Sequence, residues 1–227
     1  MSKFLVAIDG PAGSGKSSVS KEVARRLNFN YLDTGAAYRA LAWAVHNLIE
    51  FDLSNLATEV VEPESFAKKF AYEISTDPDQ TWVRVGAHDV TEAIRTTEVS
   101  ESVSAVASIQ EVRDFMKWLT HRIADQSNRL GIVIEGRDIT TVVAPEAQVR
   151  LLLTASEEVR LRRRSKEIGA SSEAHVVRQV LERDASDSKV VDFLNPAPGV
   201  SLVDSTNLDF EQTVQAVLAL VEIKRGQ

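Results

Sequence analysis

Residues 10–17 read Gly-Pro-Ala-Gly-Ser-Gly-Lys-Ser, and this stretch constrains the fold of the chain more than any other. The apolar run Phe4–Ile8 precedes it, and apolar residues with helical spacing follow it from Val19 to Leu27. The spacing G-x-x-x-x-G-K-[ST], set between a buried strand and a helix, is typical of a phosphate-binding loop. The stretch therefore predicts a site for a nucleoside triphosphate, but it leaves open what, if anything, receives a phosphate.

Each part of this loop has an expected task. The glycines let backbone N–H groups converge on an anion, and the helix N-terminus adds its positive end. Lys16 would reach the outer phosphates and the Ser17 hydroxyl would bind Mg²⁺. A chance glycine turn is the alternative, which the flanking strand and helix disfavour. The residues expected to hold the nucleoside triphosphate are Gly10, Pro11, Ala12, Gly13, Ser14, Gly15, Lys16, Ser17 and Ser18.

The composition excludes several classes of protein and of site. The chain has no cysteine, which excludes disulfides, thiolate zinc sites and a cysteine nucleophile. Its net charge of −7 is not typical of a protein that coats nucleic acid. The apolar residues at the N-terminus are too few for a signal peptide, and no apolar run is long enough to span a membrane. We expect a soluble, cytoplasmic protein without a nucleic-acid or membrane partner.

Strands and helices alternate along most of the chain, which predicts an α/β fold with a central parallel sheet. Strands are expected at 3–9, 31–32, 131–134, 149–153 and 201–203, and helices at 15–27, 35–50, 98–107, 110–127, 156–168, 172–186 and 209–224. Ligands of such folds bind at the carboxyl ends of the strands. The glycine loop, Asp33-Thr34 and Arg137-Asp138 all follow predicted strands.

Residues 71–90 break the alternation. Residues 72–75 and 82–85 alternate in polarity, with Asp77-Pro78-Asp79 between them, which indicates an antiparallel hairpin. Asp89-Val90 extends it to a small sheet, which we interpret as an inserted lobe. Residues 52–70 are mixed and predict no clear element.

Charged residues cluster at three further places, and each has a structural alternative. Arg39, one turn into the helix that Thr34 caps, suits a phosphate or a solvated surface. Arg137 beside Asp138 suits a ligand with both a phosphate and a donor group, or a salt-bridging turn. The third cluster is Arg160, Arg162, Arg163, Arg164 and Lys166, which suits a lid closing over triphosphate or a solvated helix face.

Arg183 and Asp187 are four residues apart on a predicted helix, so an intrahelical ion pair explains them without a ligand. No general base stands out among these clusters. An acceptor that is itself a phosphate ester needs none, because it is already a dianion near pH 7.

Together the clusters resemble the bacterial-type cytidylate kinases. The matching stretches are 8–17, 31–39, 94–96 with 98–99, 112–113, 136–138 with 141–143, 183–184 with 187–188, and 203–206. The resemblance covers nearly the whole chain in the order usual for the family. It implies transfer of the γ-phosphate of ATP to CMP or dCMP with Mg²⁺, by a monomer acting on small molecules.

The resemblance also implies an architecture for the single domain 1–227. A three-layer P-loop kinase core would span about 1–34, 108–155 and 190–227, with an inserted monophosphate-binding lobe at about 35–107 that carries the small antiparallel sheet. A helical lid would span about 156–189.

Roles for individual residues follow from the same resemblance. Lys16, Arg137, Arg160 and Arg163 would be catalytic, and Ser17 would bind the metal. The residues that would bind CMP are Thr34, Tyr38, Arg39, Ser104, Arg113, Arg137, Asp138, Arg183 and Asp187. Among these, Asp138 is matched to the exocyclic amine of cytosine, the group that separates cytosine from uracil.

The chain departs from the family pattern at a few positions. Thr120-His121 stands where Gln-Arg is usual, and Thr140 stands where the family has glycine. The arginine expected shortly after Asp187 is absent, and Lys189 there offers a point charge without a bidentate fork. A kinase for another nucleoside monophosphate or a small metabolite, and a non-kinase nucleotide switch, are the alternative functions.

Overall fold

The computed structural model of the 227-residue chain describes residues 3–168 and 194–226. Contacts divide the chain into two compact units, one of residues 1–31 with 129–227 and the other of residues 32–128. Among the described residues, no helix is both long and apolar enough to cross a membrane. Each unit has its own hydrophobic core.

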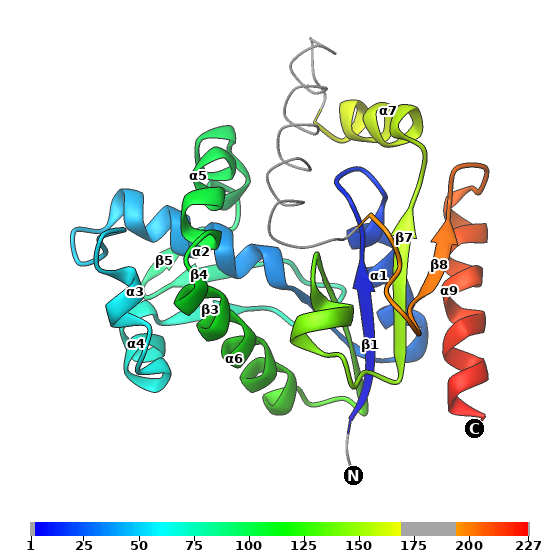
Figure 1. Ribbon diagram of the computed structural model, residues 1–227, viewed down its shortest axis with the longest axis horizontal. Helices are drawn as coiled ribbons and strands as arrows, with labels where there is room; N and C mark the ends of the chain where they lie inside the picture. Colours follow the sequence, from blue (N-terminus) through cyan, green and yellow to red (C-terminus); the bar gives the residue numbers. More distant parts are fainter. Residues whose placement is uncertain (1–2, 169–193, 227) are drawn as a thin grey trace. The chain divides into compact units, whose positions relative to one another are not determined.

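The first unit is built on a five-stranded parallel sheet in the order β2-β6-β1-β7-β8 (Figure 1). Its strands are β1 (Phe4–Asp9), β2 (Asn30–Asp33), β6 (Gly131–Gly136), β7 (Val149–Thr154) and β8 (Ser201–Asp204), and the division between the units falls within β2. Its helices are α1 (Lys16–Leu27), α7 (Glu157–Ile168) and α9 (Phe210–Arg225), with a π-helical turn η2 (Ile139–Val143). The predicted parallel α/β fold is confirmed.

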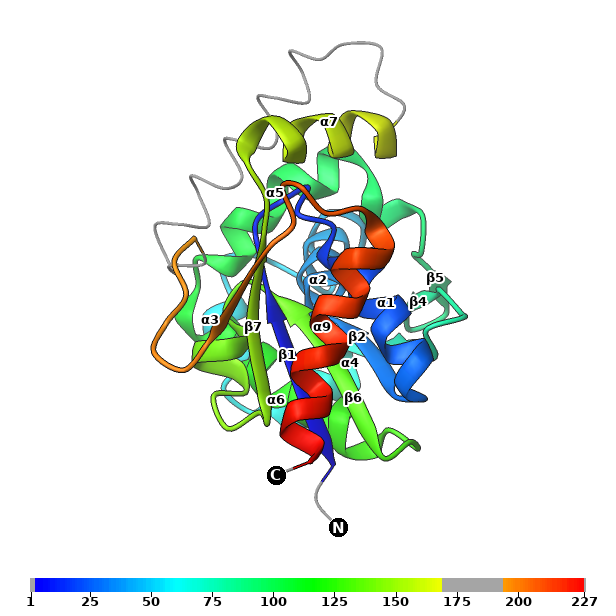
Figure 2. The ribbon, with the colours of Figure 1, turned by 90° about the vertical axis from the view of Figure 1, so that its right-hand side faces the viewer.

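One face of this sheet is covered by α1 and α9, which lie side by side in Figure 2. The apolar residues of β1 at even positions, Val6 and Ile8, join Val23 of α1 and Val217 of α9 in one buried cluster. Because neighbouring residues of a strand point to opposite faces, Asp9 points to the other face, where η2 lies. This alternation brings a carboxylate under the start of the glycine loop.

The second unit holds the predicted antiparallel sheet, made of β3 (Tyr72–Ile74), β4 (Val83–Val85) and β5 (His88–Asp89). Its helical elements are α2 (Thr34–Asn47), α3 (Leu56–Glu59), α4 (Pro63–Phe70), η1 (Ala93–Arg95), α5 (Thr97–Ala107) and α6 (Gln110–Gln126). The sequence had predicted no clear element in residues 52–70, yet α3 and α4 form there. Pro63 starts α4, and Phe66 and Phe70 anchor it in the core of this unit.

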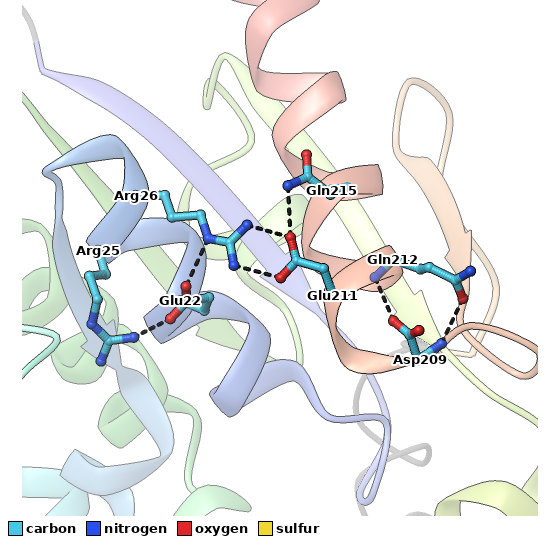
Figure 3. Close-up of polar contacts among 7 residues, drawn as sticks. All are labelled: Glu22, Arg25, Arg26, Asp209, Glu211, Gln212 and Gln215. Atoms are coloured by element: carbon cyan, nitrogen blue, oxygen red, sulfur yellow. Dashed lines mark hydrogen bonds and ion pairs between the residues drawn. The ribbon is translucent and has the colours of Figure 1, made fainter.

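An ion-pair network joins α1 to α9 within the first unit (Figure 3). The guanidinium of Arg26 donates to both carboxylate oxygens of Glu211, at 2.7 and 2.6 Å, and to Glu22 at 2.8 Å. Gln215 also donates to Glu211, at 2.9 Å. The hydrogen bonds that Glu211 accepts, above all those from Arg26, lower the pKa of its carboxyl group from 4.5 to about 2.

This network predicts an acid-sensitive contribution to stability. Because the folded pKa of Glu211 is depressed, the contribution is complete above about pH 4.5 and is lost as the pH falls toward 2. Melting temperatures measured by circular dichroism should therefore show Glu211→Gln below wild type near neutral pH. The gap should close on acidification and in high salt, because the pair is exposed. Glu222→Gln, an exposed change on the same helix, should leave no such gap. A gap that is still undiminished at about pH 2 would contradict the assignment.

Candidate active site

The glycine loop connects β1 to α1 and depends on the absence of side chains at three positions. Gly13 and Gly15 have positive φ angles of 74° and 86°, which other residues rarely adopt. A Cβ on Gly10 would lie 2.3 Å from the carbonyl oxygen of Leu153, and one on Gly13 would lie 2.4 Å from that of Arg160. The loop is thus packed directly against the end of β7 and against α7.

The start of α1 is arranged for an anion. Gly15 is the N-cap residue, and neither a capping side chain nor an acidic residue occupies the first turn. The first N–H groups of a helix have no partner within the helix, so they remain available to a phosphate. Lys16 is the first residue of α1 and is half-buried. This geometry suits a polyphosphate bound over residues 10–17.

Two arginines of α7 bind the carbonyl groups of the loop. Nη1 of Arg160 donates to the carbonyl of Ala12 at 2.9 Å, and Nη1 of Arg163 donates to that of Ser14 at 3.3 Å. Arg163 also donates to the hydroxyl and the carbonyl of Ser205, at 2.9 and 3.0 Å. Arg160 is only 7% exposed, so the alternative of a solvated face is wrong for this residue. The predicted catalytic role of both arginines stays a prediction, while their described contacts support the shape of the loop.

Ser17 is bonded to Glu135, a residue that the sequence reasoning did not single out. The Ser17 hydroxyl donates to Oε2 of Glu135 at 2.9 Å, and the Tyr31 hydroxyl donates to Oε1 of the same carboxylate. Glu135 is 1% exposed near the end of β6. A carboxylate directly before Gly136 at the end of a predicted buried strand was the available signal.

Ser17 and Glu135 are the residues that fit a Mg²⁺ ion. Mg²⁺ at nucleotide sites is usually held by one or two protein oxygens together with phosphates and water. Among residues 3–168 and 194–226, no cluster of three or more acidic or histidine side chains forms a complete metal cage. A hydroxyl and a carboxylate 2.9 Å apart at the loop match the partial donor set that Mg²⁺ uses.

Arg137 and Asp138 lie in the turn between β6 and η2, and both are half-buried. Nη1 of Arg137 donates to the carbonyl of Gly10 at 3.1 Å, which connects this turn to the glycine loop. The carbonyl of Asp138 accepts from the N–H groups of Val142 and Val143, at 2.8 and 3.1 Å. Two of the predicted acceptor residues, Arg137 and Asp138, thus lie in a turn that is bonded to the phosphate loop.

The carboxylate of Asp9 supports the same turn from below. Oδ1 accepts from the N–H of Ile139 at 2.9 Å, and Oδ2 accepts from the N–H and the hydroxyl of Thr140, at 2.8 and 2.6 Å. Burial raises the pKa of Asp9, against the opposing effects of these hydrogen bonds and of the charge of Lys16. Three donors directed at two oxygens match an ionised carboxylate, which only accepts.

In the second unit, the predicted residues Thr34, Tyr38 and Arg39 lie at the start of α2. The predicted cap, Thr34, is wrong: Asp33 caps this helix, because its Oδ1 accepts from the N–H of Ala36 at 3.1 Å. Its Oδ2 accepts from Nη2 of Arg39 at 2.7 Å. A Cβ on Gly35 would lie 2.9 Å from Nη1 of Arg39. Gly35 therefore makes room for the ion pair that orients Arg39, and Asp33 is a second residue that the prediction missed.

Ser104 and Arg113 belong to the same unit, on α5 and α6, and both are half-buried. Nη1 of Arg113 donates to the carbonyls of Ala107 and Ser108, at 2.9 and 3.3 Å, so it holds the connection between these helices. Arg183, Asp187 and Lys189 lie outside the described residues.

A parallel sheet whose first strand enters a glycine loop, followed by Lys16 and Ser17 at a helix start, defines a P-loop nucleotide-binding protein. The resemblance drawn from the sequence is borne out by comparison. The sequence model of the cytidylate kinase family matches residues 6–223. The chain therefore belongs to the cytidylate kinase family.

Curated relatives match over nearly their full length. The cytidylate kinase of Cutibacterium acnes is 44% identical over 98% of this chain and 97% of its own. That of Streptomyces griseus is 42% identical over 99% of this chain and 95% of its own. That of Carboxydothermus hydrogenoformans is 40% identical over 95% of this chain and 96% of its own.

Proposed function

We propose that this protein transfers the γ-phosphate of ATP to CMP or dCMP, giving ADP and CDP or dCDP. The observation that carries the proposal is the hydrogen bond from Arg137 to the carbonyl of Gly10. It holds the Arg137–Asp138 turn beside a phosphate-binding loop. The names of the full-length relatives support the same acceptor.

The donor would bind along residues 10–18. Backbone N–H groups at the start of α1 and the ammonium of Lys16 would neutralise the outer phosphates. Ser17 and Glu135 would hold the Mg²⁺, which when bound offsets charge on the β- and γ-phosphates. Arg160 and Arg163 would keep the loop in shape through the carbonyls of Ala12 and Ser14.

The acceptor would be bound through its phosphate and its base. Arg137 in the first unit and Arg39 in the second are the proposed phosphate contacts, because a guanidinium binds a phosphate in bidentate fashion. Asp138 would accept from the exocyclic amine of cytosine. The further contacts proposed are Thr34, Tyr38, Ser104, Arg113, Arg183 and Asp187.

The reaction needs no general base in this proposal. An oxygen of the acceptor phosphate attacks the γ-phosphorus, and the bond to the bridging oxygen of the ADP leaving group breaks. The acceptor phosphate is already a dianion near neutral pH. Catalysis would then rest on positioning and on charge neutralisation by Lys16 and Arg137.

We further propose that the protein works in the cytoplasm as a monomer on small-molecule substrates, without a nucleic-acid or membrane partner. The net charge of −7 supports the absence of a nucleic-acid partner, because an acidic surface repels polyanions.

A panel of acceptors tests the function. ADP release should be followed with MgATP and CMP, dCMP, UMP, AMP or no acceptor, for wild type and for Asp138→Ala. Wild type should prefer CMP and dCMP. Asp138→Ala should reduce the preference for CMP over UMP by about tenfold to a hundredfold, because one base-reading contact is lost.

Glu146→Ala, an exposed acidic position in the same unit, is the matched control and should keep the preference. A wild-type preference for UMP or AMP would overturn the cytosine assignment. Slow ATP hydrolysis that no acceptor stimulates would indicate a nucleotide switch instead.

A further inference from the structure

Asp9 occupies a junction between the sheet and the proposed site. It is the last residue of β1 and directly precedes Gly10. Its side chain points away from the face that α1 and α9 cover, and it is 3% exposed. A carboxylate this deeply buried is costly unless hydrogen bonds satisfy its oxygens. The groups that donate hydrogen bonds to Asp9 therefore indicate its role in the fold.

Three hydrogen-bond donors to this carboxylate come from the first two residues of η2. They are the N–H of Ile139 at 2.9 Å, the N–H of Thr140 at 2.8 Å and the Thr140 hydroxyl at 2.6 Å. Thr140 is itself 3% exposed. Hydrogen bonds to an ionised acceptor are shorter and stronger than neutral ones. The family pattern has glycine where this chain has Thr140, and a glycine could not make the hydroxyl bond.

These bonds fix the residues that precede η2. Asp138 lies directly before Ile139 and has a non-helical backbone, with φ −136° and ψ 20°. π-helical turns are rare and are frequent at functional sites. In η2, the first two residues are held by the carboxylate of Asp9. With Asp9 holding η2 and Gly10 holding Arg137, the turn is tied to the strand–loop junction at both ends.

We propose that Asp9 and Thr140 are positioning residues that set the orientation of Arg137 and Asp138 toward the acceptor. Neither would touch a substrate; each acts through the turn that it holds. The inference rests on the proposed function, since it assigns the turn to the acceptor. Selectivity for the base would then depend on the buried hydroxyl of Thr140, because that hydroxyl helps to hold the turn that carries Asp138.

The test compares Thr140→Val with Thr140→Ser. Valine keeps the shape of threonine and removes the hydroxyl, while serine keeps the hydroxyl. kcat and KM should be measured for CMP, UMP and ATP, together with the melting temperature. Thr140→Val should lower kcat/KM for CMP about tenfold and reduce the preference for CMP over UMP, with KM for ATP within about twofold of wild type. Thr140→Ser should stay close to wild type.

Asp9→Asn is a second variant, and it should show the larger loss, because the NH₂ group that replaces one carboxylate oxygen cannot accept a hydrogen bond from the donors of η2. If Asp9→Asn does not fold, the comparison of Thr140→Val with Thr140→Ser still tests the proposal. A Thr140→Val protein with wild-type CMP kinetics would overturn the proposal. So would one with a lower melting temperature but unchanged KM values and base preference, because that pattern marks a purely structural role.

Failure of the proposed function has a different signature. If the proposed function is wrong, the wild-type enzyme will prefer an acceptor other than CMP or dCMP. The variants are then measured with that acceptor, and positioning by Asp9 and Thr140 still requires that kcat/KM for the acceptor change while KM for ATP does not.

Discussion

Lys16→Ala should lower kcat for phosphorylation of CMP about a thousandfold. Lys16 is the first residue of α1, where N–H groups of the helix start would face an anion, and its ammonium would add a positive charge to the same site. Preorganised charge of this kind acts mainly on the transferred phosphate, so the loss should appear in kcat more than in KM for CMP. Steady-state measurement of ADP release would show it.

The melting temperature provides a second readout for Lys16→Ala. Wild type should be stabilised by MgATP, because a ligand that binds only the folded state raises stability, and the variant should lose most of this shift. Lys224→Ala, an exposed lysine on α9, is the matched control and should behave as wild type. A Lys16→Ala enzyme within about tenfold of wild-type kcat would contradict the assignment of the loop.

Arg137→Ala should lower kcat/KM for CMP by about a hundredfold to a thousandfold. Arg137 bonds the carbonyl of Gly10 and would also bind the acceptor phosphate, so its removal disturbs both. Arg137→Lys keeps the charge but not the bidentate fork, and it should recover only part of the loss. The kinetic constants for CMP and for ATP, measured separately, would test this.

Arg225→Ala, near the end of α9, is the control for removing an exposed arginine from the same unit, and it should leave both constants unchanged. An Arg137→Ala enzyme that raises KM for ATP while leaving CMP kinetics intact would contradict the proposal. That result would place Arg137 with the donor rather than with the acceptor.

Local patterns in the sequence predicted most of the elements, because each depends on residues close in the chain. The glycine loop, the hairpin at 72–85 and the start of α2 were predicted with nearly the observed bounds, although the cap of α2 is Asp33 and not the predicted Thr34. The helices in residues 52–70 were missed, although Pro63 followed by Phe66 and Phe70 carried the signal. The π-helical turn after Asp138 was missed as well, because its geometry depends on Asp9, far away in sequence.

The hydrogen-bonding partners of the site were mostly not predictable. Glu135 accepts from Ser17, 118 residues away, and Asp9 accepts from Thr140, 131 residues away. Contacts over such separations follow from strand order, which no local pattern reveals. The arginines of α7 show the same limit, since a run of cations suits a solvated face as well as a phosphate. Packing placed Arg160 under the loop instead.

Spacing and residue type alone predicted the phosphate loop and the alternating parallel architecture, because glycine conformations and apolar periodicity act within a few residues. The family was indicated by the resemblance of longer stretches to the cytidylate kinases. Tertiary structure decided which buried carboxylates serve the loop and the turn beside it. The parallel pairing of β1 with β6 brings Glu135 and the turn after β6, distant in sequence, beside Asp9 and residues 10–17. Once buried there, each carboxylate has to be satisfied by whatever donors the packing supplies, and those donors are Ile139 and Thr140 for one and Ser17 and Tyr31 for the other.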